Sequence, residues 1–426
     1  MSEPQLPPHL NPLPQGERES RSAPNFDVLE KTLLSVPSPL EGEGKGEGYA
    51  PNTTIFIASL PIHLYRWTLK PFLGHWCRYE PSCSEYGIET IKKHGALKGW
   101  LLTLKRLLRC RPGGGHGYDP VPERFRRRTI QVPNYHAKPG THEIVYYEWG
   151  DLSAARTVIC VHGITRNGHD FDLIAAELAR RGCRVLCPTM PGRGESERLK
   201  HPADYQSINY VSDCLSLLDQ LNLREVDWVG TSMGGILGMC LAALHPGRIR
   251  KLVMNDIGTL VKGEALTRIY LSMHETPKRF ATRAEADAYM RSISAGFGLS
   301  HLPDKWKLFF DYSFSKLRDG GYARSYDPAI LNIKREDTND FKDVKDVELM
   351  PFWEKVNIPV LILRGEVSDI LDRPTVETMK AANPLAESIE IKDVGHTPAL
   401  MTDDQISLVT GWLLSLSPLT PAKAGI

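Results

Sequence analysis

A serine between two closely spaced glycines carries the clearest chemical signal in this sequence. Ser232 is the central residue of Gly230-Thr-Ser-Met-Gly234, which follows the short apolar run that begins at Val226 and precedes a longer one. A strand that turns this sharply into a helix forces unusual backbone angles on the serine, and it needs glycine where a Cβ would collide. The pattern predicts a nucleophile elbow with an exposed Ser232 hydroxyl, and the alternative is a Gly/Ser turn without chemistry.

A serine hydroxyl is a weak nucleophile at neutral pH and needs a general base, which a carboxylate must orient. Candidates for both follow it in the chain. Asp369 comes just after the strand-like run Ile358–Leu363, and His396 lies on a loop after a further strand-like run. We therefore predict Ser232 as nucleophile, His396 as base and Asp369 as acid. Asp256 also follows a strand-like run and is the alternative acid.

The negative charge that develops during attack on a carbonyl must be met by hydrogen-bond donors. Thr157–Val161 is predicted as an early strand, and the loop His162–Arg166 follows it. When the nucleophile lies on such an elbow, the two donors come from that loop and from the residue after the nucleophile. We therefore assign the oxyanion hole to the backbone N–H groups of Ile164 and Met233, and interpret His162 as a residue of the oxyanion loop.

The joint pattern resembles the α/β-hydrolase family, in its single-domain esterase form, over residues 128–417. The resemblance implies an α/β fold with a mostly parallel sheet flanked by helices, and hydrolysis of a carboxylic ester through an acyl-enzyme, without metal or organic cofactor. The chain order Ser, Asp, His is the order that this family shows. The resemblance rests on His162-Gly163, Pro191-Gly-Arg-Gly194, Gly230-Thr-Ser-Met-Gly234, Asn255-Asp-Ile-Gly258, Arg364-Gly-Glu-Val-Ser-Asp369 and Gly395-His396.

A helix-rich stretch between Asp256 and Ile358 is expected to form a lid over the site, at residues 259–355. Such a lid restricts access and excludes water, so its residues are expected to select the substrate. Arg166 and Arg193 are interpreted either as ligands of an anionic substrate or as solvated surface arginines. The aromatic residues of the lid either line an acyl pocket or pack the lid onto the body. They are Trp306, Phe309, Phe310, Tyr312 and Phe314.

The segment ahead of the hydrolase differs in composition. The chain has 426 residues and a formal net charge of +1, but residues 55–128 contain fourteen Lys or Arg against five Asp or Glu, a charge of +9. Residues 1–52 are rich in Pro, Gly and Glu and are expected to be disordered, because they contain few large apolar side chains to bury. Residues 97–109 place leucines at helical spacing with a basic flank that includes Arg106. Such a helix either lies on an anionic bilayer or covers the module's own core.

Residues 53–124 resemble the membrane protein insertion efficiency factor (YidD) family. The resemblance rests on Cys77-Arg-Tyr-Glu-Pro-Ser-Cys83, on Arg106-Leu-Leu-Arg-Cys110 and on Asp119-Pro-Val-Pro122. It implies a peripheral protein on the cytoplasmic side of the bacterial inner membrane, with the Sec translocase and its insertase as partners. We expect no nucleic-acid partner, no signal peptide and no transmembrane helix. A metal site at the three cysteines with His75 or His116 stays an alternative, although the spacing is not that of a zinc knuckle.

Two functions are therefore expected in one chain. The first is a serine esterase acting on a small acyl ester, placed near the bilayer by the basic module. The alternative is a non-enzymatic insertion factor to which the hydrolase has been joined by gene fusion or misannotation.

Overall fold

A computed structural model describes residues 52–73, 77–115, 117–119, 121, 125–135, 140–331 and 344–415. The chain divides into two compact units. The first comprises the residues up to Arg78 together with Ser82–Gly115, and the second comprises Tyr79–Pro81 and the residues from His116 onward. Each unit is described by itself. Disorder is predicted for residues 1–52. Apart from Asn52, these residues lie outside the described part of the chain.

The first unit is helical. Its core is small and contains the buried side chains of Ile62, Ile88 and Ile91. Trp100 closes this core at one side and donates an indole hydrogen bond to the carbonyl oxygen of Ala58 at 2.9 Å. Its helices are α2 (Asn52–Thr68), α3 (Lys70–Leu73), α4 (Cys83–His94) and α5 (Ala96–Arg109).

The second unit is built on an eight-stranded sheet with the order β14-β13-β8-β7-β5-β6-β4-β3. Strands β3 and β4 pair antiparallel, as do β4 and β6, and the remaining pairs are parallel. The central strands are buried along their length, which explains their unbroken apolar sequences. The strands are β3 (Arg126–Pro133), β4 (Thr141–Trp149), β5 (Thr157–Val161), β6 (Arg184–Thr189), β7 (Val226–Thr231), β8 (Ile249–Asn255), β13 (Val360–Gly365) and β14 (Ala386–Ile391).

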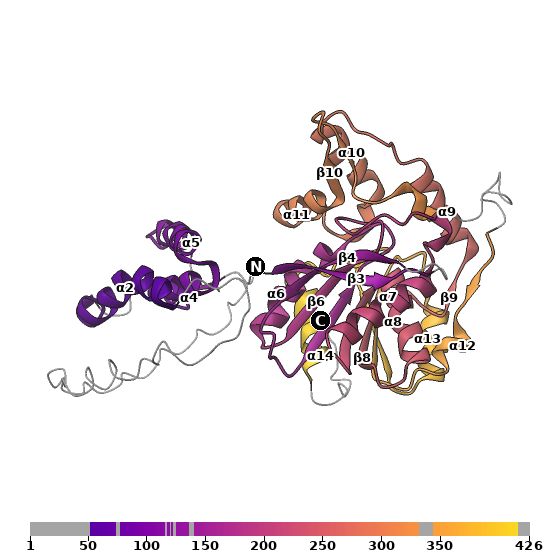
Figure 1. Cartoon of the computed structure of the whole chain (residues 1–426), viewed down its shortest axis with the longest axis horizontal. Coiled ribbons are helices and arrows are strands. Elements are labelled where there is room, and N and C mark those ends of the chain that lie inside the picture. Colours follow the sequence, from indigo (N-terminus) through magenta and orange to yellow (C-terminus); the bar gives the residue numbers. More distant parts are fainter. Residues whose placement is uncertain are drawn as a thin grey trace, which may run out of the picture. The chain divides into compact units, whose positions relative to one another are not determined.

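Helices cover both faces of this sheet (Figure 1). Side chains of α6 (Asp172–Arg180) and α14 (Asp403–Leu414) pack into the core on one face. The other face is covered by α7 (Ser207–Gln220), α8 (Met233–Leu244), α12 (Met350–Trp353) and α13 (Arg373–Ala382). The predicted α/β fold, a mostly parallel sheet flanked by helices, is thereby confirmed.

The expected lid, residues 259–355, is described except for residues 332–343. Its last helix, α12, covers one face of the sheet, and its other helices lie beyond one edge of the sheet in Figure 1. It is mainly helical, but it also contains short strands that the sequence pattern did not predict. Its elements are β9 (Leu260–Val261), α9 (Gly263–His274), α10 (Arg283–Ile293), α11 (Pro303–Ser313), β10 (Phe314–Lys316), β11 (Tyr322–Arg324) and β12 (Val347–Glu348), with short 3₁₀ turns at Ala295–Phe297 and Pro328–Leu331. Strands β10 and β11 form an antiparallel hairpin, and β9 pairs with β12.

The aromatic residues of the lid mostly pack against one another. Trp306, Phe309, Phe310 and Phe314 belong to one buried cluster, and Tyr312 stacks on the His169 ring at 3.8 Å between centroids. Packing rather than an acyl pocket therefore accounts for four of the five, and Phe309 also reaches the cavity described below.

Candidate active site

Ser232 lies in a sharp turn between β7 and α8. Its φ of 50° and ψ of −112° are unusual for a residue with a side chain, and its N–H donates to the carbonyl oxygen of Asn255 at 2.9 Å. The flanking glycines are required by close contacts. A Cβ at Gly230 would lie 2.2 Å from the Gly234 oxygen, and one at Gly234 would lie 1.9 Å from the Val161 oxygen. The turn therefore has the geometry of a nucleophile elbow.

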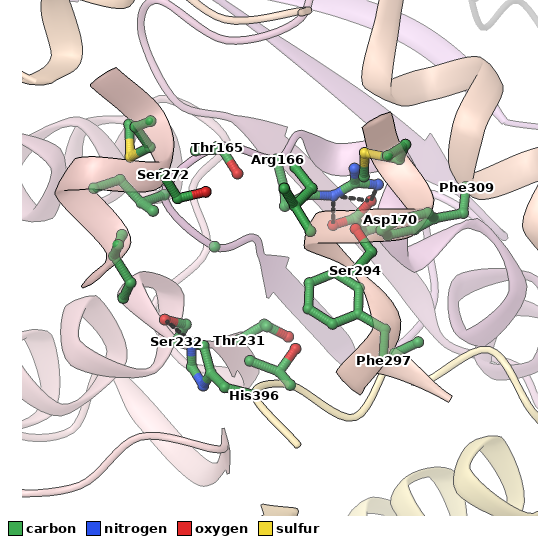
Figure 2. A pocket seen from close by; sticks show the side chains of 18 of the residues that line it. Thr165, Arg166, Asp170, Thr231, Ser232, Ser272, Ser294, Phe297, Phe309 and His396 are labelled. Atoms are coloured by element: carbon green, nitrogen blue, oxygen red, sulfur yellow. Dashed lines mark hydrogen bonds and ion pairs between the residues drawn. The ribbon is translucent and has the colours of Figure 1, made fainter. Parts of the chain in front are cut away.

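A continuous hydrogen-bonded chain connects Ser232 to a buried carboxylate. Ser232 Oγ and His396 Nε2 are 3.0 Å apart, and His396 Nδ1 is 2.7 Å from Asp256 Oδ2. Figure 2 shows the Ser232 and His396 side chains next to each other at one end of a pocket. With the imidazole donating from Nδ1 to Asp256, Nε2 is left to accept the serine proton.

The acid at this position is Asp256, and the prediction that Asp369 lies beside His396 is wrong. The Asp369 side chain is half exposed, and its Oδ2 accepts a hydrogen bond from Arg268 Nε at 2.5 Å. Asp256 follows β8 and is fully buried. Strands β8 and β13 are parallel neighbours, so their carboxyl ends reach the same sheet edge and either loop offers an acid there.

The segment Arg364–Asp369, which was predicted to supply the acid, instead donates hydrogen bonds to Asp256. The N–H of Gly365 donates to Asp256 Oδ1 at 2.8 Å, and the hydroxyl of Ser368 donates to Asp256 Oδ2 at 2.6 Å. Together with His396, these groups give the carboxylate three donors and so fix its orientation. Neither supporting group was predicted, because a turn after a strand shows no sequence sign of which carboxylate it will bind.

The expected oxyanion-hole residues lie on either side of Ser232. Met233 is the first residue of α8, where helical N–H groups have no partner within the helix. The other side is the loop after β5, where a Cβ at Gly163 would lie 3.7 Å from Ser232 Cβ. In the part of the chain that the structure describes, no group accepts a hydrogen bond from the N–H of Ile164. Ile164 lines the same cavity as Ser232, and Met233 follows Ser232 directly, so the assignment of both N–H groups to the oxyanion hole stays a prediction.

Two buried side chains hold the loop that carries Ile164. The N–H of Met190 donates to His162 Nε2 at 2.9 Å, and His162 Nδ1 donates to the Gly163 oxygen at 2.7 Å. Burial lowers the pKa of His162 to about 4, so the ring is neutral and its tautomer is defined by these two bonds. Arg193 Nε donates to the Ile164 oxygen at 2.9 Å. Arg193 is buried and is neither a solvated surface residue nor a ligand in the pocket, so both earlier interpretations of it are wrong.

A cavity of about 140 Å³ opens beside Ser232 and His396 and is enclosed on the far side by the lid. Figure 2 shows the pair of Arg166 and Asp170 away from Ser232 within the same pocket. Arg166 is buried and binds Asp170 through Nε at 2.8 and 3.0 Å, so it is not a surface residue either. The apolar lining is formed mainly by Ile164, Ile269, Met273, Met290, Ile293, Phe297, Phe309 and Met401. Arg324 also lines the cavity, and no motif in the sequence marks it.

The three cysteines of the first unit form a cluster in which all Sγ atoms lie within 4.8 Å of one another. Cys77 Sγ is 3.2 Å from Cys83 Sγ and 3.9 Å from Cys110 Sγ. Burial, followed by hydrogen bonding to Cys77, raises the pKa of Cys83. Three thiols at this spacing are a ligand set suited to a thiophilic cation. His75 and His116, the alternative further ligands, lie outside the described residues.

Helix α5 presents its leucines to solvent rather than to the core of its unit. Leu97 is 90% exposed, and Leu101, Leu104, Leu107 and Leu108 are each about half exposed or more. The side chain expected on the basic flank, Arg106, is fully buried, with its guanidinium 4.2 Å from the centre of the Tyr86 ring. The interpretation of these leucines as the module's own core is therefore wrong. Among the described helices none has the length and apolar character needed to cross a membrane.

Comparison with known proteins identifies both parts of the chain. The family model described as "alpha/beta hydrolase fold" matches residues 156–400, and the one described as "Putative membrane protein insertion efficiency factor" matches residues 54–122. A 3-hydroxybutyrate-oligomer hydrolase of Cupriavidus necator is 39% identical over 274 residues, which cover 63% of this chain and 92% of the relative. A "Putative membrane protein insertion efficiency factor" of Cereibacter sphaeroides is 56% identical over 66 residues, covering 16% of this chain and 79% of the relative.

A solved structure agrees with the larger match. The X-ray structure of a "Putative Hydrolase" from Rickettsia typhi is 34% identical with a TM-score of 0.62, and the match covers 68% of this chain and 98% of that one. An α/β-hydrolase from Novosphingobium aromaticivorans is 30% identical with a TM-score of 0.57, covering 67% of this chain and 98% of that one. The chain therefore belongs to the α/β-hydrolase family, and its residues 54–122 belong to the family of membrane protein insertion efficiency factors.

Proposed function

We propose that this protein is a serine hydrolase that cleaves carboxylic esters with Ser232 as nucleophile, His396 as base and Asp256 as the orienting acid. The observation that carries the proposal is the unbroken series of hydrogen bonds from Asp256 through His396 to Ser232, which ends at a cavity. A hydroxyl paired with an imidazole that is itself held by a buried carboxylate is the arrangement that activates a serine.

In the proposed reaction, Ser232 Oγ attacks the ester carbonyl carbon while its proton moves to His396 Nε2. The carbonyl oxygen becomes an anion and accepts hydrogen bonds from the N–H groups of Ile164 and Met233, a donor of this kind being worth ~10²- to 10³-fold in rate. The ester C–O bond then breaks, and His396 returns the proton to the leaving alcohol. Water attacks the acyl-enzyme, its proton passes to His396 and then to Ser232, and the carboxylic acid is released.

The proposed substrates are short esters of hydroxy acids. The Cupriavidus necator relative is named as a hydrolase of 3-hydroxybutyrate oligomers, and the chain matches 92% of its length at 39% identity. The cavity beside Ser232 is small and its lining is more apolar than polar, which suits a short aliphatic acyl chain.

Covalent labelling with a fluorophosphonate probe tests the nucleophile. We expect the full chain to acquire one adduct, on the peptide that contains Ser232, and Ser232→Ala to acquire none. Ser272 also lines the cavity, so Ser272→Ala is a matched control that is expected to be labelled like the wild type. Peptide mass mapping locates the adduct. Labelling that persists in Ser232→Ala, or that maps to Ser272, would remove Ser232 from the proposed role.

A second function is proposed for the first unit: binding to an anionic membrane surface, in support of membrane protein insertion beside the Sec translocase and its insertase. The specific observation is the exposed row of leucines along α5, on which Lys98, Lys105 and Arg109 are exposed as well. An apolar helix face flanked by basic residues inserts into the headgroup region, while the basic residues attract anionic lipid.

Sedimentation of the full chain with vesicles checks this second function. Replacing Leu104 and Leu108 with Gln is expected to weaken binding to phosphatidylglycerol-containing vesicles by roughly 10-fold or more, because two apolar side chains then no longer enter the lipid. Leu152→Gln removes an equally exposed leucine from the second unit and is expected to bind like the wild type. Raising the salt concentration should weaken binding of all variants. Equal binding of the Leu104/Leu108 variant and the wild type would contradict the proposal.

A further inference from the structure

An arginine of the lid lines the cavity without an anionic partner. Arg324 is the last residue of β11, and its side chain is only 8% exposed. It borders the same cavity as Ser232 and His396. Its Nε is buried and has no hydrogen-bond partner, and among the described residues no carboxylate lies within ion-pair distance of its guanidinium. A buried cation is ordinarily paired, so this one is an exception that needs a cause.

The other two arginines that line the cavity differ from Arg324 in this respect. Arg166 binds both oxygens of Asp170, and Arg268 binds Asp369. In each of those pairs the positive charge of the arginine is balanced by the negative charge of the aspartate. The cavity therefore contains one uncompensated positive charge, and it belongs to Arg324.

Aromatic rings position the guanidinium but do not neutralise it. The Cζ atom of Arg324 lies 5.6 Å from the centre of the Phe314 ring and 5.2 Å from that of Tyr326. Cation–π contacts of this kind offset part of the loss of hydration and leave the charge in place. Burial, in addition, lowers the pKa of Arg324, because the buried charge has lost the stabilisation that water gives. An arginine side chain nevertheless stays protonated in proteins.

We propose that Arg324 binds a carboxylate of the substrate, so that the ester cleaved at Ser232 is one that carries a free carboxylate elsewhere in the molecule. This inference rests on the proposed hydrolase function and specifies its substrate class. A guanidinium donates two parallel hydrogen bonds to a carboxylate, and such a charge-assisted pair is strong and directional. The lid then provides the arginine that binds the carboxylate, while the loops at the sheet edge provide the residues that cleave the ester.

A chemical consequence follows for oligomers of hydroxy acids. Such an oligomer has a carboxylate at one end only, because every other carboxyl group is engaged in an ester bond. A cavity that encloses both Ser232 and Arg324 therefore selects ester bonds near the acid end. The expected products are short hydroxy acids released from that end, rather than fragments cut from the interior.

Paired substrates that differ only in charge test the subsite. They are the free-acid dimer of 3-hydroxybutyrate and the methyl ester of the same dimer, with p-nitrophenyl butyrate as a neutral reporter of ester hydrolysis. For the wild type we expect kcat/KM on the free acid to exceed that on the methyl ester. Arg324→Gln is expected to lower kcat/KM on the free acid on the order of 10- to 100-fold, mainly through KM, and to leave both neutral esters within about 3-fold. Arg324→Lys is expected to recover part of the loss, because it keeps the charge without the bidentate geometry.

The matched control is Arg318→Gln, which removes an exposed arginine from the turn between β10 and β11. It should behave like the wild type on all three substrates. Thermal denaturation of each variant checks folding. An equal loss on charged and neutral esters in Arg324→Gln would show a structural role and overturn the proposal, as would a wild type that hydrolyses neutral esters without preferring the free acid. A wild type that hydrolyses no ester would overturn the hydrolase function itself, and the subsite with it.

Discussion

Asp256→Asn is expected to lower kcat for ester hydrolysis by about 10⁴-fold, whereas Asp369→Asn is expected to leave kcat within about 3-fold of the wild type. The two acids follow neighbouring parallel strands, and only Asp256 reaches His396. An amide at position 256 keeps the shape of the side chain but removes the charge that stabilises the imidazolium formed during catalysis. It also permits the wrong imidazole tautomer, with the proton on Nε2 and none to donate towards residue 256.

Steady-state kinetics on p-nitrophenyl butyrate provides the measurement, with Asp369→Asn as the matched control for the same chemical change. Asp256 also accepts hydrogen bonds from Gly365 and Ser368, so the thermal stability of Asp256→Asn must be measured beside its activity. A folded Asp256→Asn variant with near-normal kcat would contradict this assignment. A large loss in Asp369→Asn alone would restore the acid that the sequence pattern favoured.

Gly234→Ala is expected to abolish activity and to lower the free energy of unfolding by roughly 1–3 kcal/mol. The added Cβ would lie 1.9 Å from the Val161 oxygen and 2.5 Å from the Val161 carbonyl carbon, so the backbone of the turn or of β5 has to move. Movement of β5 displaces the oxyanion loop, and movement of the turn displaces Ser232. Either shift displaces Ser232 from the oxyanion loop, and the relative position of these groups must be correct to within a few tenths of an ångström.

Gly411→Ala is the control for this substitution. Gly411 lies within α14, is exposed, and has no atom within 4 Å of an added Cβ. Alanine there is expected to raise the free energy of unfolding by about 0.5–1 kcal/mol, because glycine is the poorer helix former, and to leave kcat unchanged. Chemical denaturation and p-nitrophenyl butyrate hydrolysis measure both effects. If Gly234→Ala kept wild-type activity, a strict nucleophile elbow would not be required.

The parts of the site that were predictable are those in which neighbours along the chain determine the geometry. The elbow at Ser232 depends on a strand, a turn and a helix within about ten residues, and the glycines that it needs lie two positions away on either side. The strands β5, β7, β8 and β13 were predictable for a similar reason, because an apolar run bounded by turn residues marks a strand buried on both faces. The same applies to the overall α/β class.

Other parts depend on which distant segments meet. Arg106 and Arg193 are typical surface residues by type, yet each is buried because a neighbouring element offers a ring or carbonyl oxygens. Conversely, the leucines of α5 have the spacing of a core face and are exposed, because the unit around them is too small to cover both sides of that helix. Periodicity identifies an apolar face but does not specify what covers it.

The sequence by itself determined the fold class, the elbow, the base candidate and the presence of two family segments, since each of these is written in local patterns or in motif order. Only the tertiary structure decided that Asp256 rather than Asp369 reaches His396, and that Arg324 lines the cavity of Ser232 without a carboxylate partner among the described residues. The physical reason is the same in both cases. Hydrogen bonds and ion pairs are selected by distances of a few ångströms, and residues far apart in the chain acquire such distances only when the sheet and lid are assembled.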